Sequence, residues 1–304
     1  MSNNNVNMTQ EKTHMGKRAK SIIANTTIHT LLVIMSIIWL IPFVFIVLQS
    51  FRTEVKVVND VSKMVTWQVG YVWPKTWGFT NYINLFKSDF PKWYLNTFII
   101  AVVVAALQTI IVLCMSYTLS RFRFKMRKPL MNIMLILGMF PGMLAMIILY
   151  KVLSDLHLAG ANAVPGLILV YIASSGMGYY VSKGFFDTIP KSLDEAARID
   201  GANRAQVLTK VILPLAKPIV IYTILTAFMA PWGDFVFAKY ISASQPDGYN
   251  VAVGLWSWLS KDQINNKYTM FCAGGVVVAI PVTLLFMFLQ KYYVEGVTGG
   301  AVKG

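Results

Sequence analysis

Six long stretches of the chain are almost purely apolar, and shorter segments between them hold most of the charged residues. Five of the six contain no Asp, Glu, Lys or Arg, and the fifth contains one carboxylate, Asp234. A helix that crosses the roughly 30 Å hydrocarbon core of a bilayer needs about 20 apolar residues, and lipid does not satisfy an open backbone. The pattern predicts an all-α integral membrane protein with six transmembrane helices at 31–48, 97–119, 130–150, 164–181, 219–238 and 271–289.

The overall composition supports this class. Hydrophobic residues make up 56% of the 304 positions and charged residues 13%, and the mean hydropathy is +0.57. Soluble domains carry about 25% charged residues, so a soluble fold is excluded. The net charge of +14 is a feature of many nucleic-acid-binding proteins, and its placement along the chain decides what it means.

Basic residues gather in three segments that share one side of the membrane if six helices alternate. These are the amino-terminal tail, the loop "RFRFKMRK" after the second stretch, and the polar segment 182–218. Cytoplasmic loops carry the excess of Lys and Arg, so both termini are predicted to be cytoplasmic. This rule accounts for the basic excess without nucleic acid, and it places the chain in the plasma or inner membrane, surrounded by lipid.

The same alternation divides the chain into segments. We expect a cytoplasmic tail over 1–26, a first transmembrane helix with a long outer loop over 27–95, a permease-like core over 96–291, and a cytoplasmic glycine-rich tail over 292–304. In the outer loop Trp93 and Tyr94 stand directly before the second helix, as in an aromatic belt at the lipid interface.

One cytoplasmic segment, "KSLDEAARIDGANRAQVLTKVILPLAKP" at 191–218, is unusually polar for this chain. Ser192 and Glu195 have the spacing of a capping box, which predicts the start of a short helix. Gly201 suits the left-handed residue that ends such a helix. A second helix is expected from Asn203 to the turn at Pro214.

The short helix carries small and charged side chains. Ala196 and Ala197 are expected to make one nearly flat face, with Glu195, Arg198 and Asp200 around it. Such a helix suits docking into a groove of another protein. An ordinary solvated loop helix has the same composition, and the residues alone leave both interpretations open.

The segment "EAARIDGA" resembles the EAA loop of permease subunits in binding-protein-dependent, ATP-driven (ABC) importers. The residues that stand where this motif expects them are Glu195, Ala196, Ala197, Asp200, Gly201, Ala202, Pro214 and Pro218. Four further stretches, "WYLNTF", "YTLSRFRFK", "GLILVY" and the terminal "GVTGGAVKG", are similar to the carbohydrate-importing branch, above all to the smaller permease of maltose or maltodextrin importers. The resemblance covers about residues 27 to 304.

The resemblance implies a type I importer permease fold and a set of partners. These are a second homologous permease, two ATPase subunits that bind ATP and Mg²⁺, and an extracytoplasmic sugar-binding protein. It implies that residues 195–197 and 200–202 contact the ATPase as part of a coupling helix. It also implies that the tail, with Gly296, Gly299 and Gly300, threads between the ATPase subunits, and glycines so dense argue against a membrane helix there.

No catalytic constellation accompanies these features. The phosphate-binding pattern GxxxxGK[ST] is absent from the sequence. His14, His29 and His157 are scattered, and neither a ligand spacing for a metal nor a nucleophile with its base is present. We therefore expect a transport subunit, not an enzyme, with no cofactor or metal of its own.

A secondary transporter or a channel without ATP coupling is the rival class. A proton- or ion-driven transporter needs ionisable groups inside the membrane, and Asp234 is the one candidate in the six stretches. Near the end of its helix this carboxylate is a poor relay. It either makes structural hydrogen bonds near Pro231, or it lines a sugar path together with Trp232.

The outer segment 240–270 carries two tryptophans, Trp256 and Trp258, in an apolar patch after a Pro-Asp-Gly turn. They either lie flat in the lipid interface, or pack against the first outer segment, or contact the binding protein. In relatives of the maltose type, the corresponding loop reaches into the docked binding protein.

Overall fold

Helices form nearly all the regular structure of the residues that the computed structural model describes. These are residues 2–53, 73–139, 142–174, 176–259 and 264–301. Within them the strand-like pairing is an isolated bridge between Arg52 and Trp77. The predicted all-α class is confirmed.

Helix α4 (Phe90–Arg121) is the central element. It packs against α7 (Ala163–Ala173), α8 (Gly176–Asp187), α12 (Lys217–Gly233) and α14 (Val251–Ser257). Small and branched apolar side chains on its inner face, including Ile100, Ala101 and Val104, are almost completely buried. At about 1.5 Å per residue, this helix is about 48 Å long, so it reaches from one end of the packed helices to the other.

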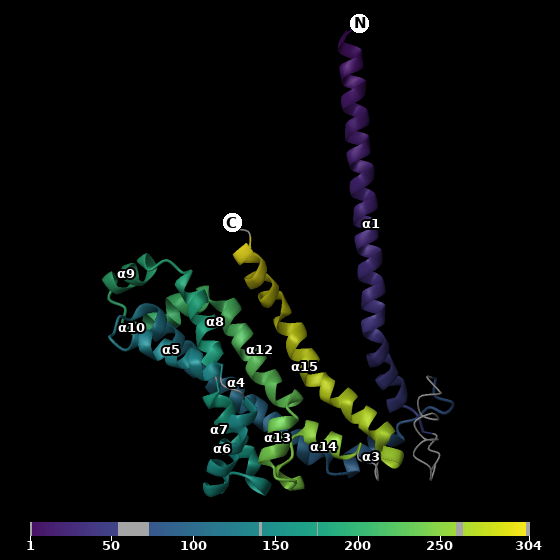
Figure 1. The fold of residues 1–304 in the computed structure, drawn as a ribbon, viewed down its shortest axis with the longest axis vertical. Coiled ribbons are helices and arrows are strands. Elements are labelled where there is room, and N and C mark those ends of the chain that lie inside the picture. The colour runs from purple at the N-terminus through teal and green to yellow at the C-terminus, as the bar shows by residue number, and fades with distance from the viewer. Residues whose placement is uncertain (1, 54–72, 140–141, 175, 260–263, 302–304) are drawn as a thin grey trace.

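Two longer helices follow: α15 (Ile264–Ala301) lies beside this centre, whereas α1 (Ser2–Ser50) projects away from it and meets the other helices near its carboxyl-terminal end (Figure 1). Helix α15 packs against α12, α3 (Thr80–Lys87) and α1. The amino-terminal end of α1 and the carboxyl-terminal end of α15 point to the same side of the molecule as α9 (Ser192–Ile199) (Figure 1).

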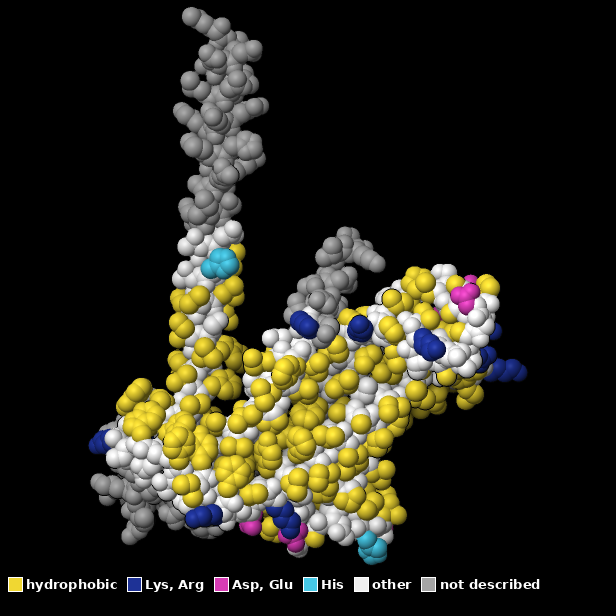
Figure 2. Space-filling view, turned by 180° about the vertical axis from the view of Figure 1, so that it is seen from behind, with side chains coloured by type: hydrophobic (Ala, Val, Ile, Leu, Met, Phe, Trp, Pro, Cys, Tyr) yellow, Lys and Arg dark blue, Asp and Glu magenta, His cyan; other side chains and the backbone are white. Residues whose placement is uncertain are grey.

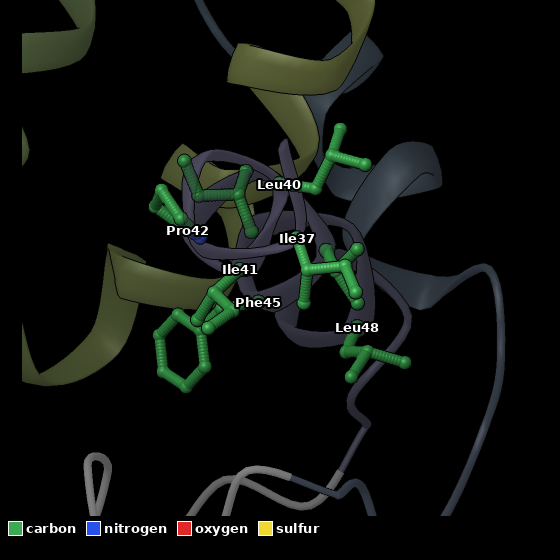
Figure 3. A pocket seen from close by; sticks show the side chains of 8 residues that line it. Ile37, Leu40, Ile41, Pro42, Phe45 and Leu48 are labelled. Atoms are coloured by element: carbon green, nitrogen blue, oxygen red, sulfur yellow. The ribbon is translucent and has the colours of Figure 1, made fainter. Parts of the chain in front are cut away.

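The surface of α1 is almost entirely apolar over residues 31–48. Ile37, Leu40, Ile41, Pro42 and Phe45 radiate from the helix and line an open groove with no polar partner among its lining side chains (Figure 3). A water-facing helix would not present such a surface. This groove suits lipid or an apolar helix and offers nothing to a polar solute.

Candidate spans in the structure match most of the predicted ones. Among the described residues, four helical stretches are long and apolar enough to cross a bilayer, at 25–50, 90–121, 160–187 and 267–291. A pair of helices bent by 87°, 204–215 with 217–233, is a fifth if it is counted as one span. The predicted stretch at 130–150 is instead divided between α5 (Arg127–Gly138) and α6 (Gly142–Asp155). Helix α5 ends at Gly138, α6 begins at Gly142, and the sequence between them holds Pro141; glycine and proline are poor helix formers.

The predicted helix over 219–238 also divides. Helix α12 ends at Gly233, and α13 (Val236–Ile241) follows it. At the break the side-chain amide of Asn250 donates hydrogen bonds to the carbonyl oxygens of Pro231 and Asp234, at 3.2 and 2.7 Å. Those carbonyls therefore have partners outside the helix, and the chain turns.

Short elements complete the fold. The polar segment after α9 contains α10 (Arg204–Gln206), the π-helical turn η2 (Val207–Ile212) and α11 (Leu213–Leu215). Two 3₁₀ turns, η1 (Gly160–Asn162) and η3 (Pro246–Gly248), contact each other at the opposite end of the molecule. Charged side chains lie toward these two ends, and apolar side chains cover the middle (Figure 2).

The glycine-rich tail differs from expectation in its conformation. Gly296, Gly299 and Gly300 belong to α15, which is helical to Ala301, while residues 302–304 lie outside the described part. A glycine costs about 1 kcal/mol in a helix relative to alanine, but extending an existing helix requires no new nucleus. The candidate span itself ends at Lys291.

Candidate functional site

The polar segment 190–216 is folded as predicted around Gly201. This residue has φ +85°, the left-handed conformation that favours glycine. The amide of Gly201 donates to the carbonyl of Arg198 at 3.1 Å, and that of Ala202 to Ala197 at 2.9 Å. These bonds end α9 sharply and turn the chain into α10.

The predicted capping box at Ser192 is wrong, and another residue forms one. Helix α9 begins at Ser192 itself, with Lys191 at the cap position and no side-chain hydrogen bond there. The box lies one helix later: Asn203 Oδ1 accepts from the amide of Gln206 at 2.9 Å, and Gln206 Oε1 accepts from the amide of Asn203 at 2.8 Å. Asn203 was assigned to the second helix without this role, although Asn-x-x-Gln has the same spacing.

The two alanines of the motif point in different directions, which corrects the prediction of a flat two-alanine face. Ala196 is exposed, whereas Ala197 and Ala202 pack against a buried apolar cluster. Successive residues of a helix are about 100° apart, so one face cannot present both side chains equally. The outward face of α9 carries Glu195 and Ala196, and next to them Ile199 is 86% exposed.

Beneath α9, the carboxyl-terminal end of α4 meets the polar segment in what we term the C-terminal junction. It comprises residues 113–121 of α4 and the following Phe122, together with residues 186–219. The buried side chains of its apolar cluster are Leu113, Tyr117, Phe186, Ile189, Val207, Ile212, Ala216 and Ile219. At about 25 cal/mol per Å² of apolar area, such a cluster fixes the segment to the membrane helices.

A buried ion pair crosses the C-terminal junction. Arg121 Nε lies 2.7 Å from Asp194 Oδ2, with the side chains only 5% and 15% exposed. Arg121 Nη2 donates to the carbonyl of Ile189 at 3.0 Å, and the guanidinium of Arg204 lies 4.5 Å over the ring of Phe122. Burial raises the pKa of Asp194, and the Arg121 guanidinium opposes this only in part.

Sequence reasoning missed this pair. Arg121 is one of five basic residues in "RFRFKMRK", and Asp194 stands beside the more familiar Glu195. Nothing in the spacing of two distant segments indicates that one member of each is buried against the other.

At its other end, α4 meets the segment 246–258 in what we term the N-terminal junction. Trp93 Nε1 donates to the carbonyl of Pro246 at 3.2 Å. Asn96 Nδ2 donates to the carbonyls of Asp247 and Tyr249 at 3.0 and 2.9 Å. The amide of Val251 donates to Thr97 Oγ1 at 2.7 Å.

Trp93 is therefore not part of an aromatic belt, because it is only 3% exposed. Its ring centroid lies 6.1 Å from that of Tyr249 and 5.3 Å from that of Trp258. A Cβ on Gly254 would lie 2.0 Å from the Trp93 ring, so only glycine permits this contact.

The two tryptophans predicted to act together have different environments. Trp258 is 3% exposed and packs on Trp93, as the packing interpretation expects, although the partner belongs to α4. Trp256 is 56% exposed and contacts the ring of Phe235 at 5.1 Å. Of the pair, only Trp256 offers a surface to lipid or a partner.

Trp232 and Asp234, which the sequence assigns either to structural hydrogen bonds or to a sugar path, have structural contacts. Asp234 accepts from the hydroxyl of Tyr171 at 2.5 Å and from the amide of Phe237 at 3.1 Å. Trp232 is 5% exposed and packs against the rings of Tyr94 and Phe228. This geometry favours the structural interpretation.

Comparisons with known proteins agree with this architecture. Residues 111–299 match the family model described as binding-protein-dependent transport system inner membrane component. The chain is 39% identical to the maltodextrin transport system permease protein MdxG of Bacillus subtilis, over 75% of this chain and 82% of the relative. It is 37% identical to the galactooligosaccharides transport system permease protein GanQ of the same organism, over 76% of this chain and 82% of the relative.

Among solved structures, the fold is similar to that of a chain from a bacterial ABC transporter involved in the import of the acidic polysaccharide alginate. The TM-score is 0.73 at 24% identity, over 89% of this chain and 96% of that one. This likeness supports the importer permease fold.

Proposed function

The chain belongs to the family of binding-protein-dependent transport system inner membrane components, and we propose on this basis that it is a permease subunit of an ATP-driven importer of maltodextrin-like oligosaccharides. Like its relatives, it is a transport component of the membrane and not an enzyme. The observation that carries the oligosaccharide assignment is the 39% identity to a maltodextrin permease over 75% of the chain.

Helix α9 is the element that contacts the ATPase. Its exposed face combines the charge of Glu195, the small Ala196 and the strongly exposed Ile199, and Asp200 and Gly201 follow at its exposed end. An apolar side chain ringed by charges fits a groove in a soluble protein. In the assembly, one ATPase subunit docks on this chain and another on a second homologous permease. The ATPase subunits bind the ATP and Mg²⁺.

Six membrane crossings with cytoplasmic termini complete the proposed topology, with α5 and α6 together forming the third crossing. The basic loops support this orientation. So does the arrangement in which the two chain ends point to the side of α9 (Figure 1). The apolar surface of α1 is then available to lipid or to the second permease (Figure 3).

The opposite end, with the exposed Trp256, faces an extracytoplasmic sugar-binding protein. Alternating access follows from closure of the ATPase pair, which brings the two coupling helices together and tips the membrane helices outward-open.

The helical tail from Gly296 onward contacts the ATPase pair. Deletion of 296–304 is expected to lower uptake or ATPase regulation and to leave membrane insertion unchanged, as measured by uptake and by membrane fractionation. Wild-type uptake and ATPase activity in the truncated subunit would instead assign the tail to ordinary end fraying.

The substrate class is tested by growth of a deletion strain on a panel of sugars. We expect growth on maltotriose and longer maltodextrins to be lost and growth on glucose to be retained, with rescue by a plasmid copy. Selective loss on galactooligosaccharides would move the substrate to that class. Unimpaired growth on every oligosaccharide, or solute conduction by the purified chain alone, would favour a transporter or channel without ATP coupling.

A further inference from the structure

The ion pair between Arg121 and Asp194 is buried at the contact between α4 and α9, where the desolvation of the two charges is costly. Both side chains are largely buried, at 5% and 15% exposed. Removing two charges from water is costly, and their mutual attraction often does not repay that cost, so such a pair is weak evidence for stability. A fixed relative position of the two elements is the better explanation of its presence.

Arg121 and the adjoining Phe122 together hold three parts of the polar segment at the carboxyl-terminal end of α4. Its guanidinium contacts α9 through Asp194 and the chain entering α9 through the carbonyl of Ile189. The adjoining Phe122 receives Arg204, the first residue of α10. Both flanks of α9 are thus attached to one place on α4, although α4 is distant in the sequence.

The same helix is fixed to the segment 246–258 at its opposite end. Trp93, Asn96 and Thr97 make four hydrogen bonds to that segment. Between the two junctions α4 is an uninterrupted α-helix with its one proline, Pro91, in the first turn. A continuous helix transmits a displacement of one end to the other without a hinge.

We propose that Arg121 is a positioning residue that fixes α9 to α4, so that a movement of α9 carries α4 and, through the N-terminal junction, the segment 246–258. This inference rests on the proposed docking of α9 with the ATPase. It adds a direct route between the ATPase side and the binding-protein side, in parallel with the covalent connections of α9 to α8 and α12.

The test uses the reconstituted complex of both permeases and the ATPase, with maltotriose-loaded binding protein as the stimulus. Asp194→Asn removes the charge and keeps the shape. We expect the variant complex to co-purify with its ATPase and to hydrolyse ATP at the basal rate. Stimulation by the loaded binding protein should fall at least tenfold, because α4 no longer follows α9.

Two further variants make the result specific. Exchanging the partners, Arg121→Asp with Asp194→Arg, restores the pair in reverse and should recover most of the stimulation. Asp155→Asn is the matched control, because it removes an ion pair of the same 2.7 Å length to Lys151 that is 76% and 60% exposed. That variant should behave as wild type.

Different failures have different meanings. Full stimulation in Asp194→Asn would overturn the positioning role while leaving α9 docking intact. Loss of stimulation that the exchanged pair does not recover would also overturn it, because the orientation of the pair, not the connection, would then matter. Failure of the wild-type chain to bind the ATPase at all would instead refute the proposed function.

Discussion

The two ends of α4 are built from different kinds of contact. At the N-terminal junction, the buried contacts are neutral hydrogen bonds and aromatic rings, packed so closely that Gly254 leaves no room for a Cβ against Trp93. An ion pair also joins Lys92 of α4 to Asp247, but both of its side chains are exposed, at 54% and 66%. At the C-terminal junction, an apolar cluster lies beneath, and charged groups hold α9 above it, with Ile199 projecting freely.

This difference separates a fixed end from a responsive one. Dense packing with satisfied neutral partners belongs to regions that open only with the whole fold. A few charged contacts and an exposed helix face are typical of a surface that a partner protein binds and displaces reversibly. We infer that the N-terminal junction follows α4 as a unit, while α9 transmits force only because specific side chains hold it.

The largest expected effect concerns the turn that orients α9. Gly201→Pro should abolish co-purification with the ATPase, because proline fixes φ near −65° and the residue has φ +85°. Gly201→Asn is the control, since asparagine tolerates the left-handed region, and it should retain most of the assembly. Co-purification from membranes with equal permease levels measures both.

Sugar-stimulated ATP hydrolysis at the wild-type rate in Gly201→Pro would contradict the docking role of α9. Equal loss in Gly201→Asn would show that the side chain, and not the backbone conformation, is what the ATPase side requires.

The next effect separates the tryptophans of the N-terminal junction. Trp258→Ala removes a buried ring that packs on Trp93, so it should destabilise the protein by about 3–5 kcal/mol. Trp256→Ala should leave stability nearly unchanged, within about 0.5 kcal/mol, because that ring is 56% exposed. Thermal unfolding in detergent distinguishes the two.

The stimulation by the binding protein should depend on the exposed tryptophan, although the stability of the fold does not. Trp256→Ala, if the ring contacts the binding protein, should raise the concentration of loaded binding protein needed for stimulation by roughly thirtyfold, equivalent to about 2 kcal/mol. An unchanged titration would assign Trp256 to the lipid interface instead.

The comparison also explains what the sequence could and could not predict. Long apolar runs, and a glycine that ends a helix in the left-handed conformation, are local signals. Most of the membrane spans and the turn at Gly201 were therefore predicted correctly. Trp93 was placed in the lipid interface because its real partner, Trp258, lies far away in the sequence. Arg121 was one basic residue among five for the same reason.

Local signals also failed where two positions competed. Ser192 and Asn203 each begin a pattern that suits a helix cap, and only the exact first turn of each helix decides which side chain reaches an amide. The stretch 130–150 looked continuous by hydropathy, but the structure divides it between α5 and α6.

The smallest expected effect compares the helix caps at the two junctions: Asn203 caps α10 at the C-terminal junction, and Asn250 caps α14 at the N-terminal junction. Asn203 and Asn250 each accept a hydrogen bond from an amide in the first turn of a helix. Asn250 is only 1% exposed and also donates to two carbonyls, whereas Asn203 is exposed. Asn250→Ala should therefore cost about 1–3 kcal/mol, because buried groups lose their partners.

Asn203→Ala should cost only about 1 kcal/mol, the usual value of a solvent-exposed cap, because water replaces part of the lost bond. Ser192→Ala is its matched control, since Ser192 makes no cap bond at the start of α9 and its removal should change stability by less than about 0.5 kcal/mol. Thermal unfolding of the three single variants in one detergent should show a loss of stability that decreases in the order Asn250→Ala, Asn203→Ala, Ser192→Ala.

A Ser192→Ala effect as large as that of Asn203→Ala would mean that α9 begins one residue later, with Ser192 as its cap. The capping box would then belong to α9, as the sequence predicts. Equal effects of Asn250→Ala and Asn203→Ala would remove the distinction between a fixed and a responsive end of α4.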